Sequence, residues 1–178
     1  MELIFIPILA SLIWAILPIK SRSIAAGLGS ISLLILLTKY NSGSFPDGLT
    51  VVDQPWLGES VRFTLSIDQI TWFMLLLTQV LFPLIVMSVK DKNWKLISWA
   101  FLMLAGLNGV FMAKDGLIFY LFWELAMIPI YFITLQFSGR DNFVTTIRFF
   151  IYTFVGSLAM LASLIYLASL SGGSFAYA

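Results

Sequence analysis

Long apolar runs separated by short polar connections dominate the 178-residue chain. Six runs can be distinguished, and in order they are residues 3–19, 24–40, 70–89, 96–113, 116–137 and 143–170. A helix rises 1.5 Å per residue, so about 20 residues cross the roughly 30 Å hydrocarbon core of a bilayer. The pattern therefore predicts an all-α polytopic membrane protein with about six transmembrane helices.

The longest connection, residues 41–68, interrupts this pattern. It is rich in Gly, Pro, Asp and Ser, as turns are. Its end has the alternating pattern of a β-strand, in which every second residue is apolar: Val61, Phe63, Leu65 and Ile67. We expect a short strand here, or half of a hairpin that lies on the membrane surface. The carboxylates of this connection and Arg62 are interpreted as a solvated loop rather than as a site.

Composition supports the membrane interpretation and narrows the possible chemistry. Hydrophobic residues make up 60% of the chain, charged residues 11%, and mean hydropathy is +0.98. Soluble domains are about half apolar and about a quarter charged. The net charge of +1 gives no reason to expect nucleic-acid binding. Because the chain contains no cysteine and no histidine, disulfides, zinc sites, thiol catalysis and ligation of iron–sulfur clusters are excluded. We expect no cofactor in this chain, so redox chemistry would take place on another chain.

One charged side chain, Glu124, lies inside the fifth apolar run. Placing an ionised carboxylate at that depth costs about 2.5–3.5 kcal/mol on insertion scales, and residues of this kind usually mark a transport pathway or a pairing site. The first hypothesis is that Glu124 handles protons. The alternative is a protonated packing residue that is hydrogen-bonded to a neighbouring helix.

Three residues of the same run are possible supporting residues. Tyr120 and Tyr131 lie on the face of Glu124, although such an aromatic stripe more often serves packing. Pro129 lacks an N–H group, so it leaves the carbonyl of Leu125 without its helical donor and is expected to kink the helix.

Two polar residues of neighbouring runs complete the candidate site. Asn108 lies in the fourth run, where Ala105 and Gly109 would allow another helix to approach closely. Arg148 lies near the start of the sixth run. Since arginine does not release its proton in proteins, Arg148 suits an electrostatic or anchoring role, or is an ordinary basic residue at a helix end.

Basic residues are distributed unevenly between alternate connections. Seven belong to the first, third and fifth connections: Lys20, Arg22, Lys90, Lys92, Lys95, Arg140 and Arg148. The opposite side holds three: Lys39, Arg62 and Lys114. Because basic connections stay in the cytoplasm, we expect the N-terminus and the long connection to face outward.

Three collinear segments resemble one family. Residues 117–133, LIFYLFWELAMIPIYFI, are similar to the FWE…MIPMY signature of the antiporter-like subunits of respiratory complex I, the proton-pumping NADH–quinone oxidoreductase, and in particular to the family of subunit M. Residues 65–88, LSIDQITWFMLLLTQVLFPLIVMS, resemble the family's entry into its third helix. Residues 147–167, IRFFIYTFVGSLAMLASLIYL, resemble its sixth helix.

The resemblance implies the N-terminal part of a fourteen-helix subunit with two inverted five-helix repeats. Residues 1–95 would form an N-terminal three-helix region with the outer loop 41–68, and residues 96–178 would begin the first, incomplete repeat. It also implies a proton half-channel built from a glutamate on helix five and a lysine on helix seven. Glu124 matches that glutamate, and the lysine would lie beyond this chain.

The function implied by the resemblance is redox-driven proton translocation by a non-redox subunit of the membrane arm, with no catalytic centre in this chain. Flavin, iron–sulfur clusters and quinone would belong to other subunits. Its partners would be the bilayer and other membrane-arm subunits, including neighbouring antiporter-like ones. A bacterial inner membrane is favoured over a thylakoid or mitochondrial one. Two alternatives stay open: an Mrp-type cation/proton antiporter or membrane hydrogenase subunit, and a structural membrane subunit without ion transport.

Overall fold

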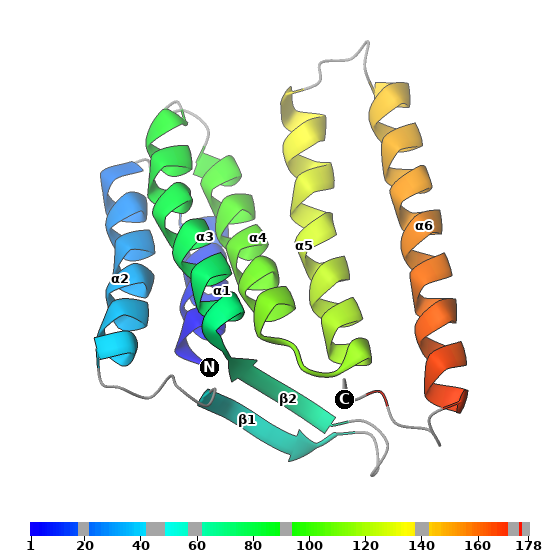
Figure 1. The fold of residues 1–178 in the computed structure, drawn as a ribbon. Helices are drawn as coiled ribbons and strands as arrows, with labels where there is room; N and C mark the ends of the chain where they lie inside the picture. Colours follow the sequence, from blue (N-terminus) through cyan, green and yellow to red (C-terminus); the bar gives the residue numbers. More distant parts are fainter. Residues whose placement is uncertain are drawn as a thin grey trace.

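The computed structural model describes residues 1–17, 22–41, 49–56, 62–89, 94–137, 143–170 and 175. Within these ranges the chain forms helices and one antiparallel hairpin (Figure 1). The elements in order are α1 (Glu2–Ile16), α2 (Arg22–Asn41), β1 (Leu49–Pro55), β2 (Arg62–Ile67), α3 (Gln69–Ser88), α4 (Trp94–Met112), α5 (Gly116–Phe137) and α6 (Phe143–Leu170). The predicted fold class is therefore confirmed in its main features, a mostly helical chain with a hairpin between the second and third helices.

Four of the helices are long and apolar enough to cross a membrane. They are α3, α6, and the stretches Lys95–Met112 of α4 and Gly116–Gln136 of α5. The apolar parts of α1 and α2, Glu2–Ile16 and Ser23–Thr38, are shorter. Residues 18–21, in which the first predicted span ends, lie outside the described residues. The prediction of transmembrane helices is thus supported for four elements, and for α1 and α2 it stays a prediction.

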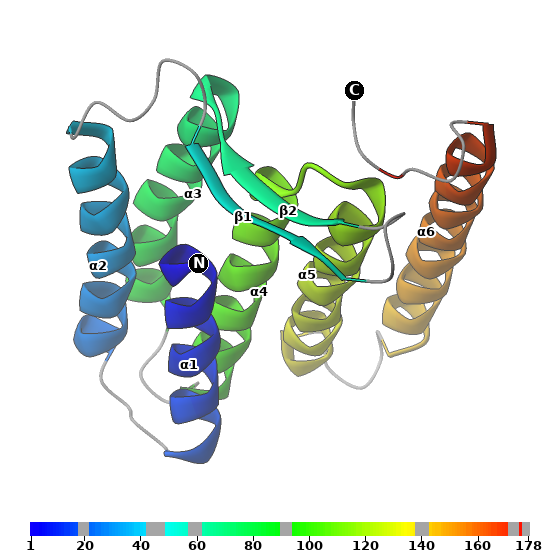
Figure 2. The same cartoon turned by 90° about the horizontal axis from the view of Figure 1, so that it is seen from below.

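Helix α4 is the central element of the bundle. It packs against α1, α3 and α5, while α2 covers α3 and α6 lies beside α5 (Figures 1 and 2). Aromatic rings join three of these helices: the ring centroid of Phe101 on α4 lies 5.6 Å from Trp14 of α1 and 4.8 Å from Phe82 of α3. The predicted division of the chain near residue 95 stays a prediction.

Small residues allow α4 and α5 to approach closely. A Cβ atom added to Gly106 would lie 2.8 Å from backbone atoms of Ala126, and one added to Gly109 would collide with the ring of Phe122. The predicted close approach at Gly109 is therefore confirmed, and Gly106 provides a second contact one turn away. This contact determines which face of α5 is directed away from α4.

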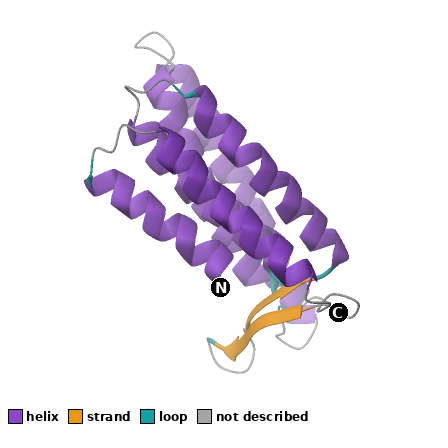
Figure 3. Ribbon diagram, turned by 90° about the vertical axis from the view of Figure 1, so that its left-hand side faces the viewer, coloured by secondary structure: helices purple, strands orange, loops and turns teal. Residues whose placement is uncertain are grey.

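The hairpin lies across the end of the bundle that holds the N-terminus (Figure 3). Leu49 pairs with Ile67 and Pro55 with Arg62, with an irregularity between Thr50 and Val52. Strand β2 shows the predicted alternation, because Leu65 and Ile67 are buried while Arg62 is exposed. Val61 lies outside the described residues.

The exposed face of the hairpin carries an ion pair. Asp53 on β1 accepts hydrogen bonds from Arg62 at 2.9 and 2.8 Å and from Thr64 at 3.0 Å. The Arg62 guanidinium therefore lowers the pKa of Asp53 below its usual value. The side chains of Asp53 and Arg62 are exposed, and that of Thr64 is half-buried.

A second ion pair fastens the hairpin to the helices. The ammonium group of Lys114, between α4 and α5, lies 2.6 Å from the Asp68 carboxylate at the start of α3. Asp68 also caps α3 by accepting the N–H of Thr71 at 2.8 Å. Lys114 first, and the Thr71 N–H next, lower the pKa of Asp68 to about 2. The backbone N–H of Lys114 donates to Thr64 of β2 at 3.0 Å, which completes the attachment.

The two ends of the bundle hold different groups of residues. The N-terminus, the hairpin, the α4–α5 connection and Phe175 gather at one end, where the N–H of Gly116 donates to the Phe175 carbonyl at 2.8 Å (Figure 1). Lys95 and Arg148 belong to the opposite half, near the starts of α4 and α6. Lys20, Lys90, Lys92 and Arg140 lie outside the described residues. Alternate connections therefore lie at opposite ends of the bundle, as the predicted topology assumes.

Candidate functional site

Glu124 lies on the side of α5 that faces away from α4. Phe122 and Ala126 contact the glycines of α4, and Glu124 is two residues from each, a rotation of about 200° around a helix. The side chain is half-buried. Its Oε1 atom is fully buried and has no hydrogen-bond partner among the described residues. The carboxyl group thus faces away from α4 and has one unpaired acceptor.

One hydroxyl group, that of Tyr120, lies close to this carboxyl group. Tyr120, one turn earlier on α5, is 8% exposed, and its hydroxyl interacts with Glu124 and with Ser157 of α6. Ser157 is 4% exposed and donates its own proton to the carbonyl of Phe154 at 2.9 Å. We call Glu124, Tyr120 and Ser157 the Glu124 cluster. Tyr120 was among the predicted supporting residues, whereas Ser157 was not.

The unpaired oxygen limits what the Glu124 cluster can do. A buried acceptor that lacks a donor costs about 1–3 kcal/mol, and more when it is charged. In the described part of the chain no basic side chain forms an ion pair with Glu124. The arrangement therefore suits a carboxyl group that binds a proton, or one that pairs with a donor from another part of the protein. The described residues include no group of three Asp or Glu side chains placed to hold a metal ion.

The other candidates on α5 and α6 have different surroundings. The ring of Tyr131 lies 4.6 Å from that of Phe150 on α6 and 5.4 Å from that of Phe132, so its described contacts are aromatic packing. Pro129 is buried inside α5, which continues beyond it to Phe137. Arg148 is exposed on α6. Their supporting roles stay predictions.

Asn108 belongs to a separate buried polar cluster. Its Nδ2 group donates to the carbonyl of Leu3 on α1 at 2.6 Å, and its Oδ1 atom accepts from Gln79 of α3 at 3.2 Å. The carbonyl of Leu3 needs this donor because Pro7, four residues later in α1, has no N–H group. Asn108 therefore connects α1, α3 and α4. The free carbonyl could have been predicted from Pro7, but its donor could not.

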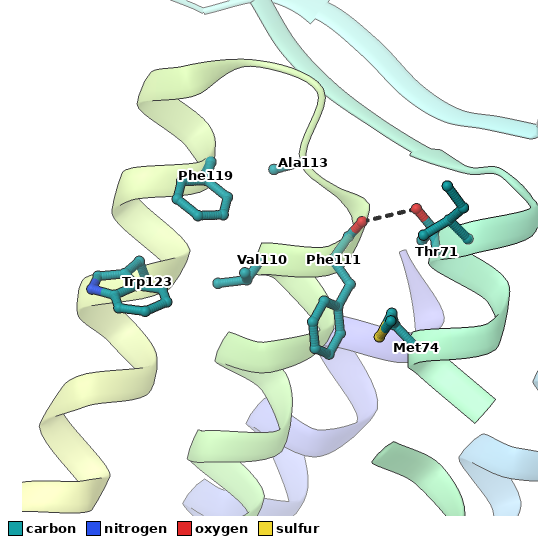
Figure 4. A pocket seen from close by; sticks show the side chains of 8 residues that line it. Thr71, Met74, Val110, Phe111, Ala113, Phe119 and Trp123 are labelled. Atoms are coloured by element: carbon teal, nitrogen blue, oxygen red, sulfur yellow. Dashed lines mark hydrogen bonds between the residues drawn. The ribbon is translucent and has the colours of Figure 1, made fainter. Parts of the chain in front are cut away.

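An apolar hollow of about 480 Å³ opens between α3, α4 and α5 (Figure 4). Its lining residues are Ile70, Thr71, Met74, Val110, Phe111, Ala113, Phe119 and Trp123. The polar side chain among them, Thr71, donates to the carbonyl of Phe111 at 3.1 Å. Trp123 and Glu124 are consecutive, so they point about 100° apart around α5. The hollow and the Glu124 cluster thus lie on different sides of the helix, and none of the described residues that line the hollow is ionisable.

Known protein sequences match this chain over different parts of its length. Residues 113–177 match the model of the family described as NADH:quinone oxidoreductase/Mrp antiporter, transmembrane. The chain is 32% identical over 171 residues to F(420)H(2) dehydrogenase subunit M of Methanosarcina mazei, and 32% identical over 142 residues to NADH-quinone oxidoreductase subunit M of Rhodobacter capsulatus. These alignments cover 86% and 78% of this chain, and 34% and 27% of the relatives. The chain therefore spans about a third of their length.

Solved structures resemble the whole described fold. Respiratory complex I from Thermus thermophilus contains a chain that is 26% identical, with a TM-score of 0.83 over 98% of this chain and 37% of that one. The membrane-bound sulfane sulfur reductase, an archaeal respiratory membrane complex, gives 0.81 at 19% identity over 99% and 29% of the two chains. The Mrp complex from Dietzia gives 0.68 at 19% identity over 99% and 20%.

Proposed function

Because the chain belongs to the family of antiporter-like membrane subunits that includes subunit M of NADH:quinone oxidoreductases, we propose that it takes part in redox-driven proton translocation in the membrane arm of such a complex. The observation that carries this proposal is the buried, unpaired oxygen of Glu124 on α5, within a helix long enough to span the bilayer. Glu124 is proposed as the proton-carrying group, with Tyr120 in direct support.

Elementary electrostatics supports such a role. Removal from water favours the neutral form of a carboxyl group, and a nearby cation favours the ionised form. A cation that approaches and withdraws can therefore unload and load the group. Moving one proton against 100 mV costs about 2.3 kcal/mol. That is less than the free energy of two pKa units at about 1.36 kcal/mol each. The cation is proposed to be a lysine that does not belong to these 178 residues.

The placement of the chain in the membrane is part of the same proposal. All six helices would cross the bilayer, with the N-terminus and the hairpin on the outer side of a bacterial inner membrane. Flavin, iron–sulfur clusters and quinone would be bound by other subunits, which would make this a non-redox subunit of the enzyme complex. The gathering of the N-terminus, hairpin and α4–α5 connection at one end supports this topology.

A cation/proton antiporter is the second candidate. It is favoured by the family model, whose description includes Mrp antiporters, and by the likeness to the Dietzia Mrp complex. The higher TM-score and identity of the complex I chain favour the first candidate. Sodium flux that needs no quinone would distinguish the antiporter. A membrane hydrogenase subunit or a purely structural subunit are the further alternatives.

The decisive experiment replaces the Glu124 carboxyl group with an amide of nearly the same shape. In inverted native membrane vesicles, Glu124→Gln is expected to abolish proton uptake per electron transferred while the complex still assembles. Proton uptake, NADH–quinone turnover and the amount of assembled complex are measured together.

The matched control is Asp53→Asn, which makes the same carboxyl-to-amide change on the exposed hairpin. It is expected to leave proton uptake unchanged. Normal proton uptake per electron by an assembled Glu124→Gln complex would show that the carboxyl group is structural.

A further inference from the structure

We propose that the apolar hollow between α3, α4 and α5 binds one phospholipid of the phosphatidylethanolamine type, with an acyl chain in the hollow and the headgroup on the ion pair of Asp68 and Lys114. The lipid phosphate accepts hydrogen bonds from Lys114, and the lipid ammonium group donates to Asp68. The inference goes beyond proton translocation and is independent of the role of Glu124, because it needs only that the three helices lie in a bilayer.

The hollow begins where the spanning helices meet the hairpin. Its lining residues come from the first two turns of α3 and α5 and from the end of α4, which are all long and apolar enough to span a membrane. Ala113 and Thr71 lie nearest the hairpin, whereas Trp123 and Met74 lie further along the helices (Figure 4). The four residues from Phe119 to Trp123 rise about 6 Å. The hollow therefore extends from the end of the spanning segments into the hydrocarbon region.

The lining of the hollow favours a hydrocarbon occupant. Thr71 is the polar residue of the lining, and its hydroxyl already donates to the Phe111 carbonyl at 3.1 Å. Apolar cavities stay dry, because a bound water needs several polar partners. An empty space, in turn, forfeits the dispersion contacts of the atoms around it. An acyl chain restores these contacts and requires no hydrogen bond from the lining.

The hollow can be entered sideways from the bilayer. Ile70, Met74 and Trp123 are exposed, so they form its rim, while Thr71 and Ala113 are buried and form its floor. An acyl chain can therefore move in from the surrounding lipid without separating the helices.

The ion pair of Asp68 and Lys114 lies beside the hairpin end of the hollow. Asp68 accepts the N–H of Thr71 at 2.8 Å, and Lys114 directly follows Ala113, so each partner adjoins a lining residue. The Lys114 Nζ atom lies 2.6 Å from the Asp68 Oδ2 atom, and both side chains are about 40% exposed. The ion pair is thus placed where the headgroup lies when the acyl chain occupies the hollow.

The ion pair has unused hydrogen-bonding capacity of both kinds. An ammonium group has three N–H donors, of which Lys114 gives one to Asp68. An ionised carboxylate has about four acceptor sites. In the described part of the chain, Asp68 uses two of them, for Lys114 and for the N–H of Thr71. The remaining donors suit a phosphate, and the remaining acceptors suit an ammonium group.

This complementarity selects the headgroup. An ethanolamine headgroup presents a phosphate and an N–H donor, which match Lys114 and Asp68 in turn. Phosphatidylcholine has no N–H group to donate, and the headgroup of phosphatidylglycerol carries no cation for Asp68. Both lipids therefore lose a charge-assisted hydrogen bond at this site.

Cross-linking of a lipid to the assembled complex tests the site. Phosphatidylethanolamine with a photoreactive diazirine in its acyl chain is added at increasing ratios to the detergent-solubilised complex, and cross-linked residues are identified by mass spectrometry. The lining residues should be labelled at lower ratios than Leu84, an exposed residue of α3 outside the hollow, and their labelling should saturate. Labelling of the hollow only in parallel with Leu84, or no labelling of the hollow, would rule out the site.

Competition in the unmodified complex tests the headgroup. Unlabelled phosphatidylethanolamine should displace the probe at a concentration about tenfold lower than phosphatidylcholine or phosphatidylglycerol, the factor that one hydrogen bond to a charged group provides. Lys114→Gln should remove this difference, whereas Lys95→Gln, near the start of α4, should preserve it. Equal competition by the three lipids in the wild type would refute the proposal.

A variant that fills the hollow provides an independent test. Val110 points from α4 towards Trp123 of α5 (Figure 4), so Val110→Trp is expected to abolish labelling of the hollow. Val80→Trp is the matched control, because it adds the same ring to an exposed residue of α3 outside the lining, and it should leave labelling unchanged. Val110→Phe and Val80→Phe replace this pair if Val110→Trp assembles poorly. Labelling that persists in an assembled complex with the filled hollow would contradict the proposal.

Discussion

At the scale of single residues, the contact between Gly106 and Ala126 makes a sharp prediction. A Cβ atom at residue 106 would lie 2.8 Å from the Cα and N atoms of Ala126, which cannot move independently of α5. Gly106→Ala is therefore expected to separate α4 from α5 and to destabilise the protein by about 1–3 kcal/mol, as over-packing usually does. The melting temperature of the detergent-solubilised complex measures the effect.

Gly156 on α6 is the matched control for this substitution. A Cβ atom there would meet nothing within 4 Å, and alanine favours a helix by up to about 1 kcal/mol over glycine. Gly156→Ala should leave the melting temperature unchanged or raise it. Equal melting temperatures for the two variants would contradict the close approach of α4 and α5.

At the scale of elements, the pair formed by Asp68 and Lys114 joins the hairpin, α3 and the α4–α5 connection. Because the folded pKa of Asp68 is lowered from 3.8 to about 2, its stabilising effect is complete above about pH 4 and is lost as pH falls from 4 to 2. Both side chains are about 40% exposed, so the effect is expected to be below about 1 kcal/mol. Asp68→Asn should lower the melting temperature slightly at pH 7 and progressively less below pH 4.

The comparison isolates the ion pair, because asparagine can still cap α3 by accepting the N–H of Thr71. A difference between wild type and Asp68→Asn that stays constant down to pH 3 would show that the ion pair with Lys114 contributes nothing.

At the scale of the whole molecule, the sidedness of the bundle can be measured directly. The chain contains no cysteine, so single cysteines report their own position. Asp53→Cys on the hairpin is expected to react with a membrane-impermeant maleimide in intact cells. Lys95→Cys, near the start of α4 at the other end, should react only in inverted vesicles. The reverse pattern would overturn the proposed orientation and leave the fold intact.

Several features of this protein could be predicted from its sequence because they depend on local physics. The cost of leaving backbone groups unpaired in a bilayer makes each long apolar run a helix, which the structure bears out for α3, α4, α5 and α6. The two-residue period before Asp68 predicted a strand, and β2 shows that alternation. Glu124 could be predicted as a candidate site residue because placing a carboxyl group inside a transmembrane helix costs free energy, whichever helices pack against it.

Contacts between residues that are distant in the sequence could be identified only from the tertiary structure. Tyr120 and Tyr131 lie on one face of α5, yet the fold places Ser157 beside the first and Phe150 beside the second. Asn108 donates to the carbonyl of Leu3, 105 residues away in the sequence. The sequence shows that Asn108 has an amide and that Pro7 leaves the Leu3 carbonyl without its helical donor, but not that the two groups meet. A sequence pattern specifies which face of a helix is polar. Which helix that face meets depends on packing among all the helices at once, and that packing determined the Glu124 cluster.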